Sequence, residues 1–201
     1  MHHYFVASEH DESEYFTFTE KFLDFDFIFK SCPDVFSKDK LDYGSLVLVK
    51  SIIDHKEIFS GNIMDMCCGY GTIAILLSKY ISAEYFMSDI NSIAVELAKE
   101  NIKLNNTGID PEDVLVGDMF DGIDRKFHHI VSNPPIKVGK KHLINFVNGA
   151  FDHLEEKGTV TLVIKKNLGE ESLKSYMTSK FGNCEIWKRD KGYYILHSIK
   201  N

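Results

Sequence analysis

The stretch DMCCGYGTIA, residues 65–74, decides the fold because it joins a predicted strand, NIMDMC (62–67), to a predicted helix that begins at Thr72. Its glycines, Gly69 and Gly71, have no side chains, so a ligand can approach the backbone closely at the start of that helix. The stretch also loosely fits the G-x-G-x-x-G/A dinucleotide-binding pattern, which is weak by itself. A strand, a glycine loop and a helix in this order indicate an α/β fold.

Outward from this loop, strand-like and helix-like stretches alternate along the chain. Strands are predicted at 62–67, 84–89, 113–117, 128–133, 159–164, 183–188 and 192–199, and helices at 41–55, 72–80, 92–104, 141–154 and 169–180. This alternation predicts a Rossmann-like, seven-stranded, mostly parallel sheet with helices on both faces. Residues 14–30 alternate apolar and polar side chains with a period of two, which indicates a β-hairpin. We expect a hairpin extension at 1–31 and one domain at 32–201.

Three aspartates fall at the carboxyl ends of predicted strands, which is where sheets of this kind bind their ligands. Carboxylates at successive strand ends suit a cationic, ribose-bearing ligand such as S-adenosylmethionine. We expect Asp65 to organise the loop and the amino group of the ligand, Asp89 to bind the ribose, and Asp118 to lie near the adenine amine. Ile90 and Met119, which follow two of these acids, join the predicted cofactor site. A turn residue explains Asp118 taken alone equally well.

The segment NPPI, residues 133–136, follows a predicted strand and supplies the predicted chemistry. An exocyclic amine is a poor nucleophile because its lone pair is delocalised into the π-system. The Asn133 side-chain oxygen and the Pro134 carbonyl can hold such an NH₂ group so that its lone pair points at a methyl donor, while Pro135 stiffens the corner. Attack on a sulfonium disperses charge, so a dry, rigid site assists it. Asn133, Pro134, Pro135 and Ile136 are therefore the predicted catalytic residues; the alternative is a proline turn that only closes a strand.

Together, DMCCGYG, Asp89, the GD pair at 117–118 and NPPI resemble a class I S-adenosylmethionine-dependent methyltransferase. Within that superfamily the chain resembles the small-subunit (16S) ribosomal RNA guanine-N2 methyltransferases of the RsmC type, in a short single-domain form. Further segments match in order: HYF at 3–5, PDVFSKDKLDYGS at 33–45, NPPIKVGKK at 133–141, LVIKKNLG at 162–169 and KGYYIL at 191–196. The resemblance implies S-adenosyl-L-methionine as cofactor and rRNA or the small ribosomal subunit as partner. It also implies that four more residues belong to the cofactor site: Phe36, Ser37, Asp42 and Ser45.

Two residues depart from the pattern of this family. Cys67 stands where the first loop glycine is expected, so a side chain is added where the backbone passes close to the donor, and reduced donor affinity is expected. Ile136 stands where many amine methyltransferases have an aromatic residue. Stacking on the target base, worth ~1–3 kcal/mol per base, then comes from elsewhere or is weaker.

Charge is distributed unevenly along the chain. The net charge of −7 argues weakly against a nucleic-acid partner, but residues 125–201 carry 14 Lys and Arg against 7 Asp and Glu, whereas residues 1–124 carry 9 against 23. A basic half indicates a face that meets an anion, although ordinary solvated surfaces explain the charge equally well. Five lysines are predicted to flank the site and hold phosphates: Lys137, Lys140, Lys141, Lys165 and Lys166. For the last two, simple solvation is an equal alternative.

Composition limits the remaining possibilities. No signal-peptide pattern and no apolar run near ~20 residues is present, which predicts a cytoplasmic protein away from membranes. The four cysteines show no C-x-x-C spacing, so neither a metal site nor a disulfide framework is expected. Three other functions stay open: methylation of another amine (adenine, cytosine or a protein glutamine), a nucleotide-dependent oxidoreductase that uses the glycine loop, and a non-catalytic assembly protein, for which Cys67 is the hint.

Overall fold

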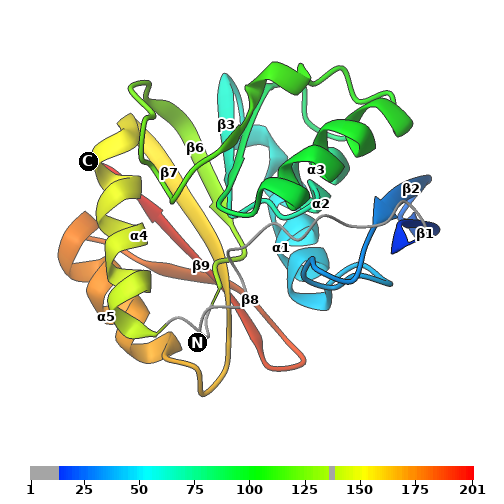
Figure 1. The fold of residues 1–201 in the computed structure, drawn as a ribbon. Helices are drawn as coiled ribbons and strands as arrows, with labels where there is room; N and C mark the ends of the chain where they lie inside the picture. Colours follow the sequence, from blue (N-terminus) through cyan, green and yellow to red (C-terminus); the bar gives the residue numbers. More distant parts are fainter. Residues whose placement is uncertain (1–13, 136–138) are drawn as a thin grey trace.

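A seven-stranded sheet forms the centre of the computed structural model, which describes residues 14–135 and 139–201 (Figure 1). The strand order is β5-β4-β3-β6-β7-β9-β8. The strands are β3 (Asn62–Met66), β4 (Glu84–Asp89), β5 (Val114–Val116), β6 (Phe127–Ser132), β7 (Leu154–Lys165), β8 (Glu185–Asp190) and β9 (Tyr193–Ile199). Strands β3 to β7 pair in parallel, whereas β9 runs antiparallel to both of its neighbours. The predicted seven-stranded, mostly parallel sheet is confirmed.

Helices cover both faces of the sheet, with α1 to α3 on one side and α4 and α5 on the other (Figure 1). The helices are α1 (Tyr43–Ile53), α2 (Thr72–Leu77), α3 (Ser92–Leu104), α4 (Lys140–His153) and α5 (Glu170–Phe181), with short 3₁₀ turns at Lys56–Ile58 and Pro111–Asp113. Alternate strand residues enter the two cores: Ile63 of β3 packs under α1 to α3, and Met64 packs under α4 and α5. A sheet buried on both faces explains why these strands are almost wholly apolar.

Several elements differ in length from the prediction, and for α2 and β7 the hydrogen bonds show why. The α2 helix ends at Leu77 rather than near residue 80, because the next turns are closed by tighter bonds from Lys79 N to the Leu76 carbonyl and from Tyr80 N to the Leu77 carbonyl. The β7 strand begins at Leu154 rather than 159, because Leu154 already pairs with Phe127 of β6. Neither difference moves a predicted site residue to another element.

The N-terminal hairpin forms a separate two-stranded sheet, β1 (Phe16–Phe22) and β2 (Phe25–Ser31), as predicted. Two side chains, one from α3 and one from the residue that follows it, bind the edge of β2 as another strand would. Asn105 accepts from the Ile28 N–H and donates to the Ile28 carbonyl, and Asn101 makes the same pair of bonds with Lys30. Asn101 also donates to the Tyr70 carbonyl at 3.0 Å. The hairpin is thereby tied to the glycine loop. The division of the chain at residues 31 and 32 stays a prediction.

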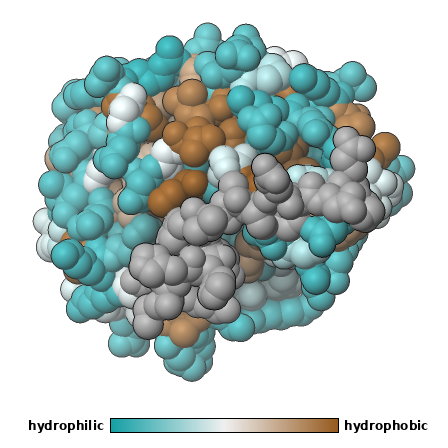
Figure 2. All heavy atoms as spheres, viewed as in Figure 1, coloured by the Kyte–Doolittle hydropathy of each residue, from teal (hydrophilic) through white to brown (hydrophobic). Residues whose placement is uncertain are grey.

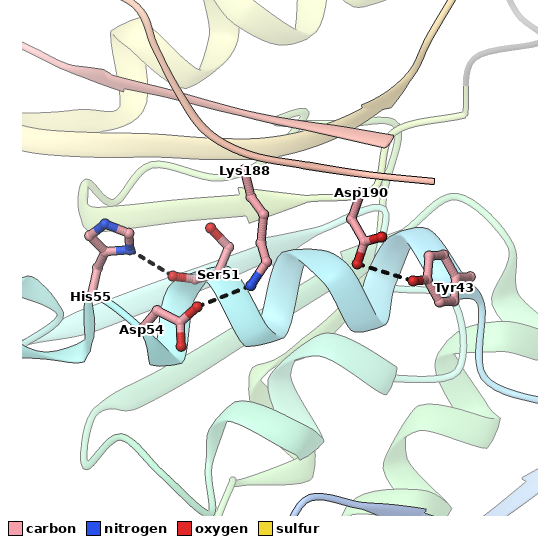
Figure 3. Close-up of polar contacts among 6 residues, drawn as sticks. All are labelled: Tyr43, Ser51, Asp54, His55, Lys188 and Asp190. Carbon is pink, nitrogen blue, oxygen red and sulfur yellow. Dashed lines mark hydrogen bonds and ion pairs between the residues drawn. The ribbon is translucent and has the colours of Figure 1, made fainter. Parts of the chain in front are cut away.

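Helix α1 is held against the edge strand β8 at both of its ends (Figure 3). At the start of the helix, the Tyr43 hydroxyl donates to the Asp190 carboxylate at 3.1 Å. At the end, the Lys188 ammonium lies 3.1 Å from the Asp54 carboxylate. Both contacts are partly exposed to solvent, so each stabilises the fold only modestly. Their consequence is geometric, because they fix the direction in which the first turn of α1 faces the sheet.

The surface gives no sign of a membrane-crossing element in the described part of the chain. None of its helices combines the length and the apolar character that a bilayer span requires. Figure 2 shows that the face turned to the viewer in Figure 1 is mainly hydrophilic, with hydrophobic residues gathered near its upper centre. All four cysteines are free thiols, and no three His, Cys, Asp or Glu side chains within 14–135 and 139–201 are grouped so that they could hold a metal ion.

Candidate active site

The carboxyl ends of three neighbouring strands meet at one edge of the sheet. Strand β3 lies between β4 and β6, with Met66 paired to Ser88 on one side and to Ser132 on the other. The loop after β3, the acid Asp89 at the end of β4 and Asn133 after β6 therefore lie side by side. Strand β5 extends this row, because Val116 pairs with Asp89. The topology thus brings together the loop, the acids and the NPPI corner.

The glycine loop needs its glycines for two different reasons. Gly71 has φ +92°, and a Cβ there would lie 2.9 Å from the Ile75 side chain and 3.3 Å from Ala98. The close packing of α2 and α3 at this point therefore requires a residue without a Cβ. Gly69 has φ +55° and nothing within 4 Å of the position of a Cβ. Open space beside a bare backbone is what a ligand approaching the loop requires. Cys67 also has a positive φ, +61°, and its side chain packs against the core beneath α4.

Asp65 lies fully buried beneath this loop. One of its carboxylate oxygens accepts from the Ala74 N–H at 3.1 Å, so it joins the end of β3 to the first turn of α2. Its other oxygen has no partner among the described residues. Burial raises the pKa of Asp65 to about 8, with a smaller contribution from the nearby Asp89 carboxylate, while the Ala74 bond opposes the rise. Asp65 thus joins the end of β3 to the start of α2. Its contact with the amino group of the ligand stays a prediction.

Asp89 binds the loop from the neighbouring strand. Its Oδ2 accepts from the Gly69 N–H at 2.8 Å and its Oδ1 from the Asn91 N–H at 2.9 Å. Burial raises the pKa of Asp89, and these backbone bonds partly counteract the effect. A carboxylate has about four acceptor positions, so two remain for the hydroxyls of a ribose. The residue is half-buried, and its bond to Gly69 places it beside the loop, while its binding of a ribose stays a prediction.

The segment 33–42 packs onto the same edge. The Tyr70 hydroxyl of the glycine loop donates to the Ser37 carbonyl at 3.0 Å, and Asn91 donates to the Asp34 carbonyl at 3.2 Å. The Ser37 hydroxyl itself closes a turn by donating to the Lys40 carbonyl at 2.7 Å. Phe36 is 62% exposed, an unusual state for a large apolar side chain beside a site. The segment thus lies next to the loop, as the resemblance implies, although its tether through Tyr70 has no signature in the sequence.

The outer residues of the predicted cofactor site are more exposed. Ile90 is 42% exposed directly after Asp89, so its apolar surface is available to a flat ring. Asp118 is exposed at the start of a turn that the Asp121 N–H closes on its carbonyl. Met119 is half-buried with φ +52°, and it packs against the same core as Cys67. These positions fit a ligand that runs outward along the strand ends.

Asn133 makes the most informative contacts at this edge. Its side-chain Nδ2 donates to Asp42 Oδ2 and to Ser45 Oγ, both at 2.9 Å. No donor in the described part of the chain bonds to its Oδ1, which leaves that oxygen available as an acceptor. Pro134 is buried and Pro135 is exposed. Asp42 and Ser45, which the resemblance assigns to the cofactor, are thus bonded to the predicted catalytic residue.

The predicted lysines are only partly located by the structure. Lys140 and Lys141 are exposed at the start of α4, Lys165 is exposed as the last residue of β7, and Lys166 is exposed directly after it. Ile136 and Lys137 lie outside the described residues. A hollow of about 750 Å³ beside Lys166 is lined by cations and acids together, and neither Gly69 nor Asn133 contributes to its walls. Asp65, Asp89 and Asn133 do not line this hollow, so it is not the site assembled above.

One residue near the site has no role in the sequence prediction. Tyr193 of β9 packs against the first turn of α1, where a Cβ on Gly44 would lie 2.8 Å from its ring. Burial raises the pKa of Tyr193, and the negative charge of Asp42 adds to the effect, which places the two side chains near each other. The Lys165 ammonium lies 5.8 Å from the centre of the same ring. The KGYYIL segment was the signal, but nothing in it indicates contact with α1.

Comparisons with known proteins agree with this geometry. The model of a family described as methyltransferase small domain matches residues 26–197. Uncharacterized protein YbxB of Bacillus subtilis is 33% identical over 98% of both chains. Ribosomal RNA small subunit methyltransferase C of Aeromonas hydrophila is 34% identical over 83% of this chain and 47% of its own. The protein of the same name from Sodalis glossinidius is 31% identical over 87% of this chain and 50% of its own. The chain thus spans about half the length of these two proteins named methyltransferase C.

Solved structures share the fold. The T. thermophilus 16S rRNA N2 G1207 methyltransferase (RsmC), in complex with AdoMet and guanosine, superposes with a TM-score of 0.82 at 24% identity, over 93% of this chain and 51% of that one. The ribosomal protein L11 methylase of Lactobacillus delbrueckii superposes with a TM-score of 0.67 at 21% identity, over 80% of this chain and 81% of that one. At these identities the likeness concerns the fold.

Proposed function

The chain belongs to the methyltransferase small domain family, a family of S-adenosylmethionine-dependent methyltransferases, and on that premise we propose that it methylates the exocyclic N2 amine of a guanine in small-subunit ribosomal RNA. Two relatives named ribosomal RNA small subunit methyltransferase C support the RNA substrate. The observation that carries the proposal is the Asn133 amide, whose NH₂ makes two hydrogen bonds and whose oxygen accepts none from the residues that the structure describes. An available acceptor beside a proline corner suits an amine substrate.

The described residues fit S-adenosyl-L-methionine. The open space at Gly69, the half-buried Asp89 carboxylate and the exposed apolar surface of Ile90 follow one another along the strand ends. Gly69 would admit the ligand to the backbone, Asp89 would accept from the ribose hydroxyls, and Ile90 would cover the adenine. When bound, the cofactor supplies an electrophilic methyl group on a cationic sulfur. Asp65 supports this arrangement indirectly by holding the loop to α2.

The chain activates the amine by orienting it. Asn133 Oδ1 and the Pro134 carbonyl each accept a hydrogen bond from one N–H group of the target NH₂. This turns the nitrogen lone pair out of conjugation and toward the methyl group. Pro134 and Pro135 hold the corner in one conformation, so little reorganisation accompanies the reaction. The methylated nitrogen is acidic while it carries its extra proton and releases it to water. No strong base is required of the protein.

RNA binding is assigned to the basic part of the chain. Lys140 and Lys141 are exposed at the start of α4, a few residues after the NPPI segment, and Lys165 and Lys166 are exposed at the end of β7. Exposed lysines hold phosphates through charge and carry little sequence information. The choice of nucleotide therefore rests on the residues around Asn133. We place this activity in the cytoplasm, where ribosomal RNA is available.

A labelled-methyl assay tests the proposal. Small-subunit RNA and small-subunit particles are incubated with the protein and labelled S-adenosylmethionine, and the RNA is digested to nucleosides. We expect label in N2-methylguanosine, and we expect Asn133→Ala to abolish turnover while its affinity for the cofactor, measured by calorimetry, stays within about twofold. Label confined to adenine, cytosine or protein glutamine would exclude guanine as the target.

Two further outcomes separate the proposal from other functions. Binding of NADH without binding of S-adenosylmethionine would indicate a nucleotide-dependent oxidoreductase. Tight binding of S-adenosylmethionine with no transfer to any of these acceptors would indicate an assembly protein. Equal turnover by Asn133→Ala and the unmodified protein would remove the orienting mechanism even if guanine were methylated.

A further inference from the structure

We propose that Asp42 and Ser45 are positioning residues that fix which way the Asn133 amide faces, an inference that rests on the proposed function. Both side chains bind the same group: Asn133 Nδ2 lies 2.9 Å from Asp42 Oδ2 and 2.9 Å from Ser45 Oγ. They come from the first turn of α1, 91 and 88 residues away from Asn133 along the chain. The contact therefore exists only in the folded protein.

The polarity of these contacts selects one orientation of the amide. A carboxylate accepts hydrogen bonds and does not donate them, so only the NH₂ of Asn133 is compatible with Asp42 Oδ2. If the amide were rotated by 180°, its oxygen would face the carboxylate oxygen at hydrogen-bond distance, where the two repel. Ser45 agrees with this polarity, because its hydroxyl lies 3.4 Å from Asp42 Oδ2 and can donate there while it accepts from Asn133. The acceptor Oδ1 is thereby directed to the substrate.

The carboxylate also improves the acceptor. A negative charge bonded to the NH₂ draws the amide protons and shifts electron density toward Oδ1, as in a chain of hydrogen bonds that polarise one another. Ser45 is buried, so water competes weakly for these bonds. Asn133 thus gains both a fixed direction and a stronger hydrogen bond to the target amine.

The positioning group stands on a rigid support. Asp42 is the N-cap of α1, and the same Oδ2 accepts from the Ser45 N–H at 2.9 Å. The Tyr43 hydroxyl donates to Asp190 of β8 (Figure 3). Gly44 lets Tyr193 of β9 pack against the same turn. Because α1 is fixed to two strands, its first turn presents Asp42 and Ser45 in one place.

Two substitutions of Asp42 separate orientation from helix stability. Asp42→Asn can place its carbonyl oxygen where Oδ2 lies, which keeps the cap and the bond to Asn133. Asp42→Ser keeps a good N-cap, but its shorter side chain does not reach Asn133. We expect Asp42→Ser to lower kcat at least about tenfold, because small misplacements of reacting groups cost about that much or more. We expect Asp42→Asn to keep kcat within about threefold, and both to keep melting temperature and cofactor affinity near those of the unmodified protein.

The side-chain amide of Asn133 provides a readout that needs no turnover. In a ¹⁵N-labelled sample its NH₂ signals are assigned as the pair that disappears in Asn133→Ala. We expect these signals to be shifted and protected from hydrogen exchange in the unmodified protein and in Asp42→Asn, and to move to exposed-amide values in Asp42→Ser. If the protein transfers no methyl group to RNA, the proposed function fails, while this measurement still decides the positioning role.

Three results would overturn the inference. The first is an Asn133 amide that behaves identically in Asp42→Ser and the unmodified protein. The second is a large loss of cofactor affinity with unchanged kcat in Asp42→Ser, which would assign Asp42 to the cofactor. The third is a loss in Asp42→Asn as large as in Asp42→Ser, which would mean that charge and not orientation matters. Ser45→Ala, which leaves the Asp42 bond in place, is expected to cost less kcat than Asp42→Ser.

Discussion

Cys67 adopts a left-handed backbone conformation, φ +61°, at the position where β3 turns into the glycine loop. Residues with a side chain occupy this region at a cost of roughly 1–2 kcal/mol, whereas glycine does so without strain. We predict that Cys67→Gly binds S-adenosylmethionine several-fold more tightly, because the loop loses both strain and a side chain next to the ligand path. Calorimetric titration of the purified variant with the cofactor measures this.

Cys67→Ala is the matched control, because it removes the thiol but keeps the Cβ and the unfavourable φ. Its cofactor affinity is expected to lie close to that of the unmodified protein if strain dominates. The prediction is wrong if Cys67→Gly binds the cofactor more weakly than the unmodified protein does. In that case the packing of the thiol beneath α4 contributes more than the strain removes.

At the scale of single residues, the sequence predicted where these groups lie better than how they are connected. Asn133 and Asp89 lie at the strand ends where the alternating pattern puts them, since the topology of a parallel sheet follows from that pattern. The bond between Asp42 and Asn133 was not predictable, because it joins two residues 91 positions apart through the tilt of α1. Contacts of this kind depend on packing, which no local pattern specifies.

The hairpin provides the prediction at the scale of elements. Asn101 of α3 binds the backbone of Lys30 in β2 through two bonds and the Tyr70 carbonyl through a third, and it is fully buried. We predict that Asn101→Ala lowers the free energy of unfolding by about 2–3 kcal/mol, because buried backbone groups are left without partners. Urea denaturation measures the loss. Faster hydrogen exchange at the Lys30 amide should accompany it.

Lys103→Ala is the control for this helix, because Lys103 is exposed on α3 and its removal should change the free energy of unfolding by less than about 0.5 kcal/mol. If Asn101→Ala is as stable as Lys103→Ala, the two bonds from the Asn101 side chain to the β2 backbone do not stabilise the fold. A stability loss without faster exchange in β2 would also argue against it.

Periodic elements were predictable and their docking was not. The alternation in residues 14–30 identified both strands of the hairpin. The sequence also showed Asn101 and Asn105 one helical turn apart, but it did not show that β2 would lie beside them. A hairpin buries its apolar face against whichever helix the tertiary fold offers, here through Phe27 and Phe29.

For the whole molecule, the charge imbalance of the sequence becomes a spatial one. Residues 125–201 supply α4, α5 and strands β6 to β9, so the basic half occupies the α4 and α5 side of the sheet (Figure 1). We predict that the affinity for small-subunit RNA falls with salt, and that Lys140→Gln with Lys141→Gln reduces the slope of log affinity against log salt by about 0.7–0.9 for each lost phosphate contact. Binding titrations at several salt concentrations measure the slope. An unchanged slope would show that these two lysines do not touch phosphate.

Stability should pass through a maximum between acid and alkaline pH, because two kinds of buried group oppose each other. The acid side is set by His129, whose Nδ1 bonds Thr159 and whose Nε2 accepts from the Ser60 N–H, an arrangement that has no place for a second proton. Burial lowers the pKa of His129 to about 4 from an ordinary 6.5, and the pKa of His197 to about 3. The unfolded chain therefore binds more protons, and stability is lost as pH falls below about 6.5.

The alkaline side is set by Asp65, whose pKa burial raises from 3.8 to about 8. Here the folded chain binds more protons between those values, so the contribution of Asp65 to stability declines as pH rises toward 8. We predict that the free energy of unfolding, measured with urea from pH 4.5 to 8.5, is greatest near pH 6–7. His129→Gln should flatten the acid limb by up to ~3 kcal/mol, since each pKa unit corresponds to ~1.4 kcal/mol, and Asp65→Asn should flatten the alkaline limb. A free energy of unfolding that rises steadily across the whole range would mean that Asp65 is ionised in the folded protein.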